Sequence, residues 1–209
     1  MKLAIDVMGF ENDISEAIKA CRKFNRQHTD VQFILVGNEQ EIKVRLKPSD
    51  HFEIVHATDV IKMDDSPLLA IRKTNSSMYK AIELVANNQA DGVLSAGSST
   101  CYVPMAFLLL KLIDGINKPA FMPYLPTTTK QGFMMLDVGA NKECTGEDLY
   151  CFAKIGSIYC QIIRNIPNPR VGIINIGTEI AKGFAYQKDA YELITKDKTI
   201  NFVGFIEPR

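Results

Sequence analysis

Three segments of the sequence join an apolar, strand-like run to a glycine loop that is rich in small polar residues. They are residues 92–100 (GVLSAGSST), 134–141 (MMLDVGAN) and 171–179 (VGIINIGTE). Glycine lets backbone N–H groups come close to a ligand, and the N-terminus of a following helix adds partial positive charge. Because ligands bind where strand ends gather at the edge of an open α/β sheet, we expect the three loops to share one edge and to form a pocket for an anion, most simply phosphate.

The loop after the first of these runs carries three consecutive hydroxyl side chains, Ser98, Ser99 and Thr100, at the predicted start of a helix. Hydroxyls beside free helix N–H groups suit an anion. The segment alone leaves an alternative open, in which Ser99 or Thr100 merely caps the helix. The loop has neither the Gly-Lys-Ser/Thr of a Walker loop nor a GxGxxG pattern, so it does not indicate a nucleotide site.

A second candidate region runs from Met63 to Ser77. Arg72 and Lys73 are two adjacent cations near the predicted start of a helix, and together they could neutralise a phosphate. The alternative is a solvated charged face. Asp64 and Asp65 are adjacent carboxylates, but two neighbouring Asp residues are weak evidence for a metal, and either could instead cap a turn at the following proline.

The third candidate is the loop of Asp137, Gly139 and Asn141. A carboxylate at the end of a strand, beside Gly and Asn, can orient a substrate group or a neighbouring lysine. Asp, Gly and Asn are also the residues that turns favour, so a purely structural turn is the alternative.

The fourth candidate is the loop of Gly177, Thr178, Glu179 and Lys182. Thr178 and Glu179 lie just beyond a predicted strand, and Lys182 could reach back toward it. A lysine in that place can stabilise charge that develops on a phosphate or acyl oxygen. The alternative is an ordinary surface loop.

Strands and helices alternate along the whole chain. The hydrophobic pattern predicts strands at residues 3–9, 31–36, 52–56, 92–95, 120–123, 132–138, 170–176 and 200–204. It predicts helices at residues 12–27, 39–46, 75–87, 99–113, 147–164 and 185–195, with Asn12 or Asp13 as the first N-cap. This order predicts an α/β fold: a three-layer, Rossmann-like sandwich with a mostly parallel sheet covered on both faces.

The domain organisation predicted from these elements is one domain over residues 1–209, or one domain and the start of another. The last predicted strand is followed by no closing helix. We therefore expect either a chain shortened at its C-terminus, a partner that covers the edge, or a strand left at the rim.

Composition narrows the class of protein. Lys and Arg total 24 and Asp and Glu total 24, so the formal net charge is zero, which argues against a nucleic-acid binder. Five cysteines without a CxxC pair predict reduced thiols in a cytosolic protein, and three histidines show no metal-ligand spacing. No signal peptide is recognisable, and the most apolar run, residues 103–110, is too short to span a bilayer.

The order of the motifs resembles that of a known family. The matching segments include AIDVMG (4–9), VIKMDDSP (60–67), AIRK (70–73), SAG (95–97), LDVGAN (136–141), NPRVG (168–172) and NIGTE (175–179). These segments resemble the phosphate acyltransferase family of bacterial phospholipid synthesis, known as PlsX, over nearly all of the sequence.

The resemblance implies an activity and partners. Such enzymes exchange the acyl carrier protein of a long-chain acyl thioester for inorganic phosphate and produce an acyl phosphate. A membrane glycerol-phosphate acyltransferase then uses this product. Family members are cytoplasmic homodimers that associate peripherally with the membrane, need no cofactor, and have a fold that resembles phosphate acetyltransferases and isocitrate dehydrogenase-like proteins. The family's dimer contacts and membrane-contacting helices lie beyond the last residue of this sequence.

With this resemblance, the candidate residues receive roles. We expect Ser95, Gly97, Ser98 and Ser99 to cradle phosphate, with Gly139, Gly177 and Thr178 as further binding residues and with Arg72 and Lys73 as charge stabilisers. We expect Lys182, Asp137, Asn141 and Glu179 to be the catalytic set, in which Lys182 stabilises charge and the other three orient the site.

Two other classes of function stay open. One is a phosphate acetyltransferase-like or dehydrogenase-like enzyme with a small substrate. The other is a non-catalytic relative that still binds acyl carrier protein.

Overall fold

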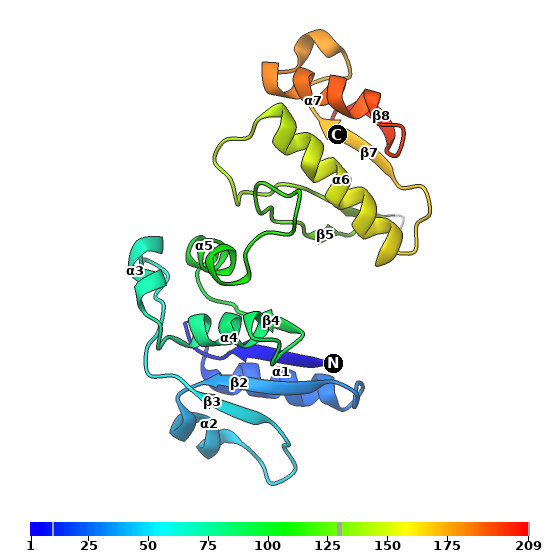
Figure 1. The fold of residues 1–209 in the computed structure, drawn as a ribbon. Coiled ribbons are helices and arrows are strands. Elements are labelled where there is room, and N and C mark those ends of the chain that lie inside the picture. Colours follow the sequence, from blue (N-terminus) through cyan, green and yellow to red (C-terminus); the bar gives the residue numbers. More distant parts are fainter. Residues whose placement is uncertain (10, 129–130, 209) are drawn as a thin grey trace. The chain divides into compact units, whose positions relative to one another are not determined.

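The computed structural model describes residues 1–9, 11–128 and 131–208. Contacts within the chain divide it into two compact units, Met1–Lys111 and Leu112–Arg209. Figure 1 shows the elements of both units, and each unit is described below on its own.

The first unit is an alternation of strands and helices. Its strands are β1 (Lys2–Asp6), β2 (Gln32–Gly37), β3 (Glu53–His56) and β4 (Gly92–Leu94). Its helices are α1 (Ile14–Asn25), α2 (Glu39–Arg45), α3 (Pro67–Arg72), α4 (Ser77–Ala86) and α5 (Ser99–Leu110). The helix α1 begins after Asp13, whose carboxylate accepts a hydrogen bond from the Ser15 N–H, so the predicted N-cap is confirmed.

The four strands of the first unit form one parallel sheet in the order β3-β2-β1-β4. In this order the chain adds strands to one side of β1 and then crosses to the other side to add β4. The point where the order reverses therefore lies between β1 and β4. In open α/β sheets this is where ligands bind, beyond the carboxyl ends of the two strands.

Helices cover both faces of this sheet (Figure 1). Ile14, Ile18 and Cys21 of α1 pack with Ile42 of α2 against one face, and Ala81 of α4 packs against the other. Alternate residues of the strands supply the two cores, because successive side chains in a strand point to opposite faces. The predicted α/β fold with a parallel sheet between helical layers is confirmed in this unit.

The second unit contains β5 (Tyr124–Leu125), β6 (Phe133–Met134), α6 (Gly146–Ile162), β7 (Arg170–Ile174), a 3₁₀ turn η1 (Ile180–Lys182), α7 (Ala185–Lys196) and β8 (Asn201–Ile206). The strands β7 and β8 pair in parallel. Their core contains Ile173, Ala190, Ile194 and Phe205, with residues of α6 packed against it. This is a strand-helix-strand unit, as the sequence predicted for residues 170–204.

The strand predicted at residues 120–123 is wrong, and the strand predicted at residues 132–138 is confirmed only for Phe133–Met134. The two strands of this region form a short antiparallel pair, Tyr124–Leu125 with Phe133–Met134. Pro123 ends the first predicted run and lacks an N–H to donate, so a regular ladder does not continue through it. Beyond Met134 the chain turns around the carboxylate of Asp137, which takes backbone N–H groups that a strand would have given to a neighbour.

The expectation that three glycine loops share one sheet edge is also wrong for the described residues. The strands that precede them, β4, β6 and β7, belong to three different sheets. The 92–100 loop lies in the first unit, and the other two lie in the second. A search of the described helices finds none that is long and apolar enough to cross a membrane.

Candidate functional site

The loops that follow β1 and β4 meet at the point where the strand order reverses. Asp6 is the last residue of β1 and is only 3% exposed. Its Oδ2 accepts a hydrogen bond of 2.7 Å from the Ser95 hydroxyl, which lies just after β4, and its Oδ1 accepts one of 3.1 Å from the Met8 N–H. One carboxylate therefore holds both loops at this edge of the sheet.

The serine loop continues from this contact. The Gly97 N–H donates to Ser95 Oγ at 3.1 Å, and a Cβ on Gly97 would lie 2.9 Å from Met78 Cε and 3.4 Å from the Gly9 carbonyl oxygen. The loop therefore passes close to Met78 of α4 and to the turn after β1 at Gly97. The predicted phosphate residues Ser95 and Gly97 thus lie together at the strand-order reversal.

The helix α5 begins immediately after this loop. Ser98 is its N-cap residue and is buried, yet its hydroxyl makes no capping hydrogen bond. Ser99 and Thr100 are exposed in the first turn, so neither is the N-cap. The N–H groups at the start of a helix have no acceptor inside it, and they add partial positive charge at this end of α5. The loop and helix start can therefore accept an anion.

Arg72 and Lys73 end α3 in the same unit but differ in their contacts. Lys73 Nζ donates to Asp65 Oδ2 at 2.6 Å and to the Val60 carbonyl oxygen at 3.2 Å. This pairing lowers the pKa of the Asp65 carboxyl. Arg72 is exposed, and no charge partner for its guanidinium is found within the described ranges. The uncompensated cation of this pair is therefore Arg72.

The Lys73–Asp65 pair is connected to the start of α5. The Asp65 carbonyl oxygen accepts a hydrogen bond of 3.2 Å from Cys101 Sγ, and Cys101 is fully buried in the first turn of that helix. Asp65 thus has a structural partner on each side, whereas Asp64 is exposed. Within the part of the chain that the structure describes, no three His, Cys, Asp or Glu side chains group as metal ligands.

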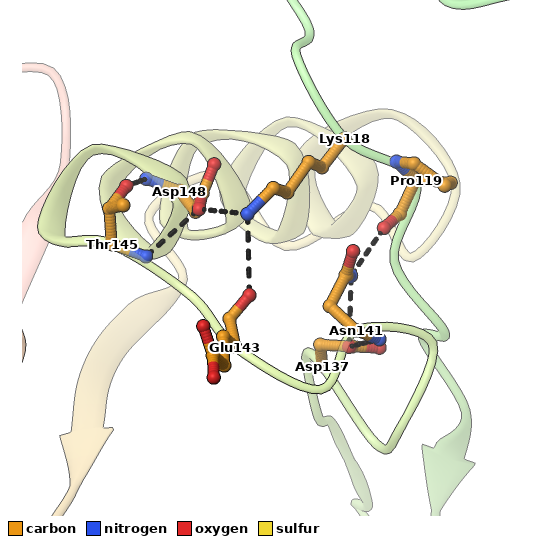
Figure 2. A network of polar contacts seen from close by, with 7 residues as sticks. All are labelled: Lys118, Pro119, Asp137, Asn141, Glu143, Thr145 and Asp148. Atoms are coloured by element: carbon orange, nitrogen blue, oxygen red, sulfur yellow. Dashed lines mark hydrogen bonds and ion pairs between the residues drawn. The ribbon is translucent and has the colours of Figure 1, made fainter.

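Asp137 organises a tight loop in the second unit. Its Oδ1 accepts from the N–H groups of Phe121 and Ala140, and its Oδ2 accepts from the N–H and the side-chain amide of Asn141. Burial raises the pKa of this carboxyl, but the hydrogen bonds outweigh burial and the pKa lies below its ordinary value. Asn141 also donates to the Pro119 carbonyl oxygen at 2.7 Å (Figure 2). In this structure both side chains are engaged in holding the loop.

Gly139 lies at the tip of the same loop. Its φ of +110° is one that residues with a side chain rarely adopt, and a Cβ there would meet no atom within 4 Å. The backbone at this position is therefore accessible as well as glycine-dependent.

The loop after β7 carries Gly177, Thr178, Glu179 and Lys182. Lys182 Nζ lies 3.0 Å from Glu179 Oε1, and both side chains are largely exposed. Lys182 lowers the pKa of the Glu179 carboxyl. A Cβ on Gly177 would lie 2.7 Å from Glu179 Oε2 and from Lys182 Cδ, so this ion pair lies against the glycine. Thr178 is exposed beside it.

Asn175 is a buried residue that holds the backbone of this loop. It is 4% exposed, and its side-chain amide donates to the Gly177 carbonyl oxygen at 3.0 Å. Its Oδ1 is buried without a hydrogen-bond partner among the described residues.

The structure thus brings some predicted residues together and keeps others apart. Ser95, Gly97 and Ser98 lie in one loop, Ser99 begins α5 directly after it, and Arg72 and Lys73 belong to the same unit. The Asp137 loop and the Lys182 loop are two separate parts of the second unit. Sequence reasoning missed Asp6, although a carboxylate at the end of a strand and just before a glycine turn was a usable signal.

Comparison with known proteins assigns the chain to a family. A family model described as "Fatty acid synthesis protein" matches residues 1–209. Among the curated relatives, a phosphate acyltransferase of Malacoplasma penetrans is 56% identical over the whole chain, which covers 63% of that protein. A phosphate acyltransferase of Mycoplasmoides gallisepticum is 48% identical, again over the whole chain and 64% of the relative. The chain thus spans less than two thirds of the length of these relatives.

A solved structure supports the fold. The crystal structure of a branched-chain phosphotransacylase from Enterococcus faecalis matches 99% of this chain and 67% of its own, with a TM-score of 0.63 and 18% identity. This likeness confirms the predicted fold class. Together with the family match, the relatives confirm the resemblance seen in the motifs: the chain belongs to the fatty acid synthesis protein family, whose similar curated members are phosphate acyltransferases.

Proposed function

We propose that this chain is the catalytic part of an acyltransferase that converts a long-chain acyl-[acyl carrier protein] and inorganic phosphate into an acyl phosphate and free carrier protein. The observation that carries the proposal is that relatives named phosphate acyltransferase are up to 56% identical to it over all its residues. The serine loop at the strand-order reversal is what such a reaction needs, because phosphate must be held by N–H groups, hydroxyls and a cation.

In the proposed reaction, a phosphate oxygen forms a bond with the thioester carbonyl carbon. The carbon–sulfur bond breaks, and the carrier thiolate leaves and takes up a proton. Because phosphate itself attacks, no side chain has to serve as a nucleophile. Positioning of phosphate and stabilisation of the oxyanion would supply the acceleration.

The proposed roles follow the contacts. Ser95, Gly97, Ser98 and Ser99 hold phosphate, with Arg72 as the available cation. Lys73 contributes less charge, since Asp65 already neutralises it.

The residues of the second unit have proposed roles as well. Lys182, balanced by Glu179, stabilises the developing charge, and Gly177 and Thr178 offer backbone and hydroxyl groups beside it. Asp137 and Asn141 keep the Gly139 backbone in position. We also propose that residues 1–209 act as one functional domain.

Partners and location are part of the same proposal. Acyl carrier protein and phosphate would be substrates, and no cofactor or nucleic acid would be required. We further propose a cytoplasmic homodimer that contacts the membrane peripherally and passes acyl phosphate to a membrane glycerol-phosphate acyltransferase.

The experiment that tests this function mixes the purified chain with palmitoyl-[acyl carrier protein] and counts freed carrier thiol with and without inorganic phosphate. The proposal expects phosphate-dependent release, and slower release by Lys182→Ala than by the control Lys198→Ala, an exposed lysine of the same unit. Release of free coenzyme A from acetyl-coenzyme A and phosphate would favour a phosphate acetyltransferase-like enzyme instead, and binding of NAD a dehydrogenase-like one. Binding of acyl carrier protein without turnover would indicate that the chain is a non-catalytic relative.

A further inference from the structure

We infer that Asp6 is a positioning residue that acts through Ser95: it holds the 95–98 loop in the conformation that receives phosphate. The inference rests on the proposed function for its ligand. Asp6 itself touches no substrate in this account. It is 3% exposed and lies behind the serine loop, at the carboxyl end of the central strand β1.

The hydrogen bonds at this point have a fixed direction. The Ser95 hydroxyl donates its single proton to Asp6 Oδ2 at 2.7 Å, which is the only direction open to it while that carboxylate is ionised. The oxygen of that hydroxyl is then left as an acceptor, and the Gly97 N–H donates to it at 3.1 Å. Asp6 therefore sets the orientation of the Ser95 hydroxyl, and Ser95 sets the orientation of the peptide that leads into α5.

The loop is confined on its other side as well. A Cβ on Gly97 would lie 2.9 Å from Met78 Cε and 3.4 Å from the Gly9 carbonyl oxygen, so the loop is packed close to α4 and to the β1 turn. Asp6 also fixes this turn, because its Oδ1 accepts from the Met8 N–H at 3.1 Å. One side chain thus couples the two loops that meet at the strand-order reversal.

A contribution to folding stability does not explain why an acidic residue occupies position 6. Among the ion pairs of the described residues none involves Asp6, and burial raises the pKa of its carboxyl despite hydrogen bonds from Ser77, Ser95 and Met8. An unpaired buried carboxylate is costly to fold, whereas an apolar residue would fill the same space more cheaply. The acceptor function toward Ser95 is the feature that an apolar residue would lose.

The test is a double-mutant cycle in the full chain with inorganic phosphate as the probe. Asp6→Asn, Ser95→Ala and the double variant are compared by isothermal titration for the Kd of phosphate and by the ¹⁵N–¹H chemical shift of the Gly97 amide. Ser95→Thr keeps the hydroxyl and serves as the conservative variant. Asp91→Asn is the matched control, because Asp91 accepts from the Lys2 N–H at 2.6 Å and joins the same two strands at their opposite end.

We expect each of Asp6→Asn and Ser95→Ala to raise the Kd about fivefold or more, which is the net effect of one lost hydrogen bond. The Kd of the double variant should be no higher than that of the single variant that binds phosphate more weakly, since both substitutions break the same chain of hydrogen bonds. Both should shift the Gly97 amide, and Asp91→Asn should change neither property. Ser95→Thr, which keeps the hydroxyl, should bind phosphate more tightly than Ser95→Ala does.

Additive effects on Kd, or an unchanged Gly97 amide in Asp6→Asn, would overturn the inference. If wild-type protein shows no phosphate binding, the proposed function fails, while the Gly97 shift still decides whether Asp6 positions the loop. Should Asp6→Asn not fold, an unchanged Gly97 amide or phosphate Kd in Ser95→Ala would overturn the inference, because Asp6 acts only through the Ser95 hydroxyl.

Discussion

At the scale of single residues, a charged side chain that already has an ion-pair partner can contribute less to the binding of an anion than one without a partner. Lys73 is held by Asp65 and by the Val60 carbonyl oxygen, whereas the neighbouring Arg72 is exposed at the end of α3. A guanidinium without a partner is free to meet an anion, and its planar donors suit phosphate. Adjacent cations of the same segment therefore differ in what they can contribute to the proposed site.

We predict that Arg72→Ala raises the KM for phosphate about tenfold, as expected for a lost charge-assisted hydrogen bond, and leaves stability nearly unchanged. Lys73→Ala should raise this KM by less than about threefold, because Asp65 already neutralises the lysine. Arg26→Ala, at another exposed arginine of the same unit, is the control. Equal effects of Arg72→Ala and Lys73→Ala on the phosphate-dependent rate would contradict this distinction.

The candidate site residues of the loops could be recognised from the sequence, but their hydrogen-bond partners could not. The small polar residues from Ser95 to Ser99 are recognisable because glycine and hydroxyl residues cluster at a predicted strand end. The role of Asp6 was not predicted, because this residue lies inside an apolar run and its hydrogen bond with Ser95 joins residues 89 positions apart. The Lys73–Asp65 pair was likewise invisible, because a turn had to bring the two side chains together.

At the scale of elements, α6 begins with a reciprocal cap that also anchors the preceding loop. Thr145 Oγ1 accepts from the Asp148 N–H at 3.2 Å, and Asp148 Oδ2 accepts from the Thr145 N–H at 2.9 Å. Figure 2 shows Lys118 reaching the same carboxylate, with its Nζ 2.7 Å from Oδ2. Burial raises the pKa of Asp148, but these contacts outweigh it and the pKa lies below its ordinary value.

We predict that Asp148→Asn lowers the free energy of unfolding by about 1 kcal/mol at pH 7, the usual cost of a damaged N-cap. A carboxyl whose pKa is lowered by folding stabilises the protein above its unfolded pKa and loses this contribution as pH falls through its folded pKa. The difference between variant and wild type should therefore shrink below about pH 4. Urea unfolding at pH 7 and pH 3 measures it.

The matched control for this cap is Glu147→Gln, an acid-to-amide change at the exposed neighbouring position. At pH 7 it should destabilise less than Asp148→Asn, because this exposed acid interacts only with the partial positive charge of the helix N-terminus. If the destabilisation by Asp148→Asn were equally large at both values, the cap would owe nothing to the charge of the carboxylate.

Secondary structure was predictable where strands were long and helices amphipathic, as for β1, β2, α1 and α7. It was not predictable for β5 and β6. There the segment 132–138, mostly apolar but with Asp137 inside it, resembles a buried strand. The backbone groups beyond Met134 instead bond to Asp137 and across to Phe121 and Pro123. Hydrophobic pattern reports burial and says nothing about which groups receive the backbone hydrogen bonds.

At the scale of the whole molecule, the two units have separate cores. The clusters around α1, α4 and α5 share no residue with the cluster of Ile173, Ala190, Ile194 and Phe205. Gly146 lies in the second unit where α6 meets α7, and a Cβ there would lie 2.6 Å from Asp189 Cβ and 2.9 Å from the Ala190 backbone nitrogen. Such a clash could not be relieved by a small movement, because these atoms belong to or adjoin the backbone of α7 and not to the end of a flexible side chain.

We predict that Gly146→Ala destabilises the second unit by about 1–3 kcal/mol, because it overpacks this helix contact. Amide hydrogen exchange in α6, α7, β7 and β8 should become faster, while protected amides in β1, β2 and β3 should exchange as in wild type. Glu147→Ala, an exposed position one residue further along, is the control. Equal acceleration in β1–β3 would show that the units unfold together.

The central claim, that the start of α5 and its serine loop hold phosphate, is tested most directly by Ser99→Asp. An acid in the first turn of a helix normally stabilises it, so this change separates a helix cap from an anion site. Ser49→Asp, at an exposed serine of the same unit, is the control. The account predicts that Ser99→Asp keeps or raises thermal stability yet raises the Kd for inorganic phosphate at least about tenfold by charge repulsion. An unchanged phosphate Kd in a folded Ser99→Asp variant would contradict it.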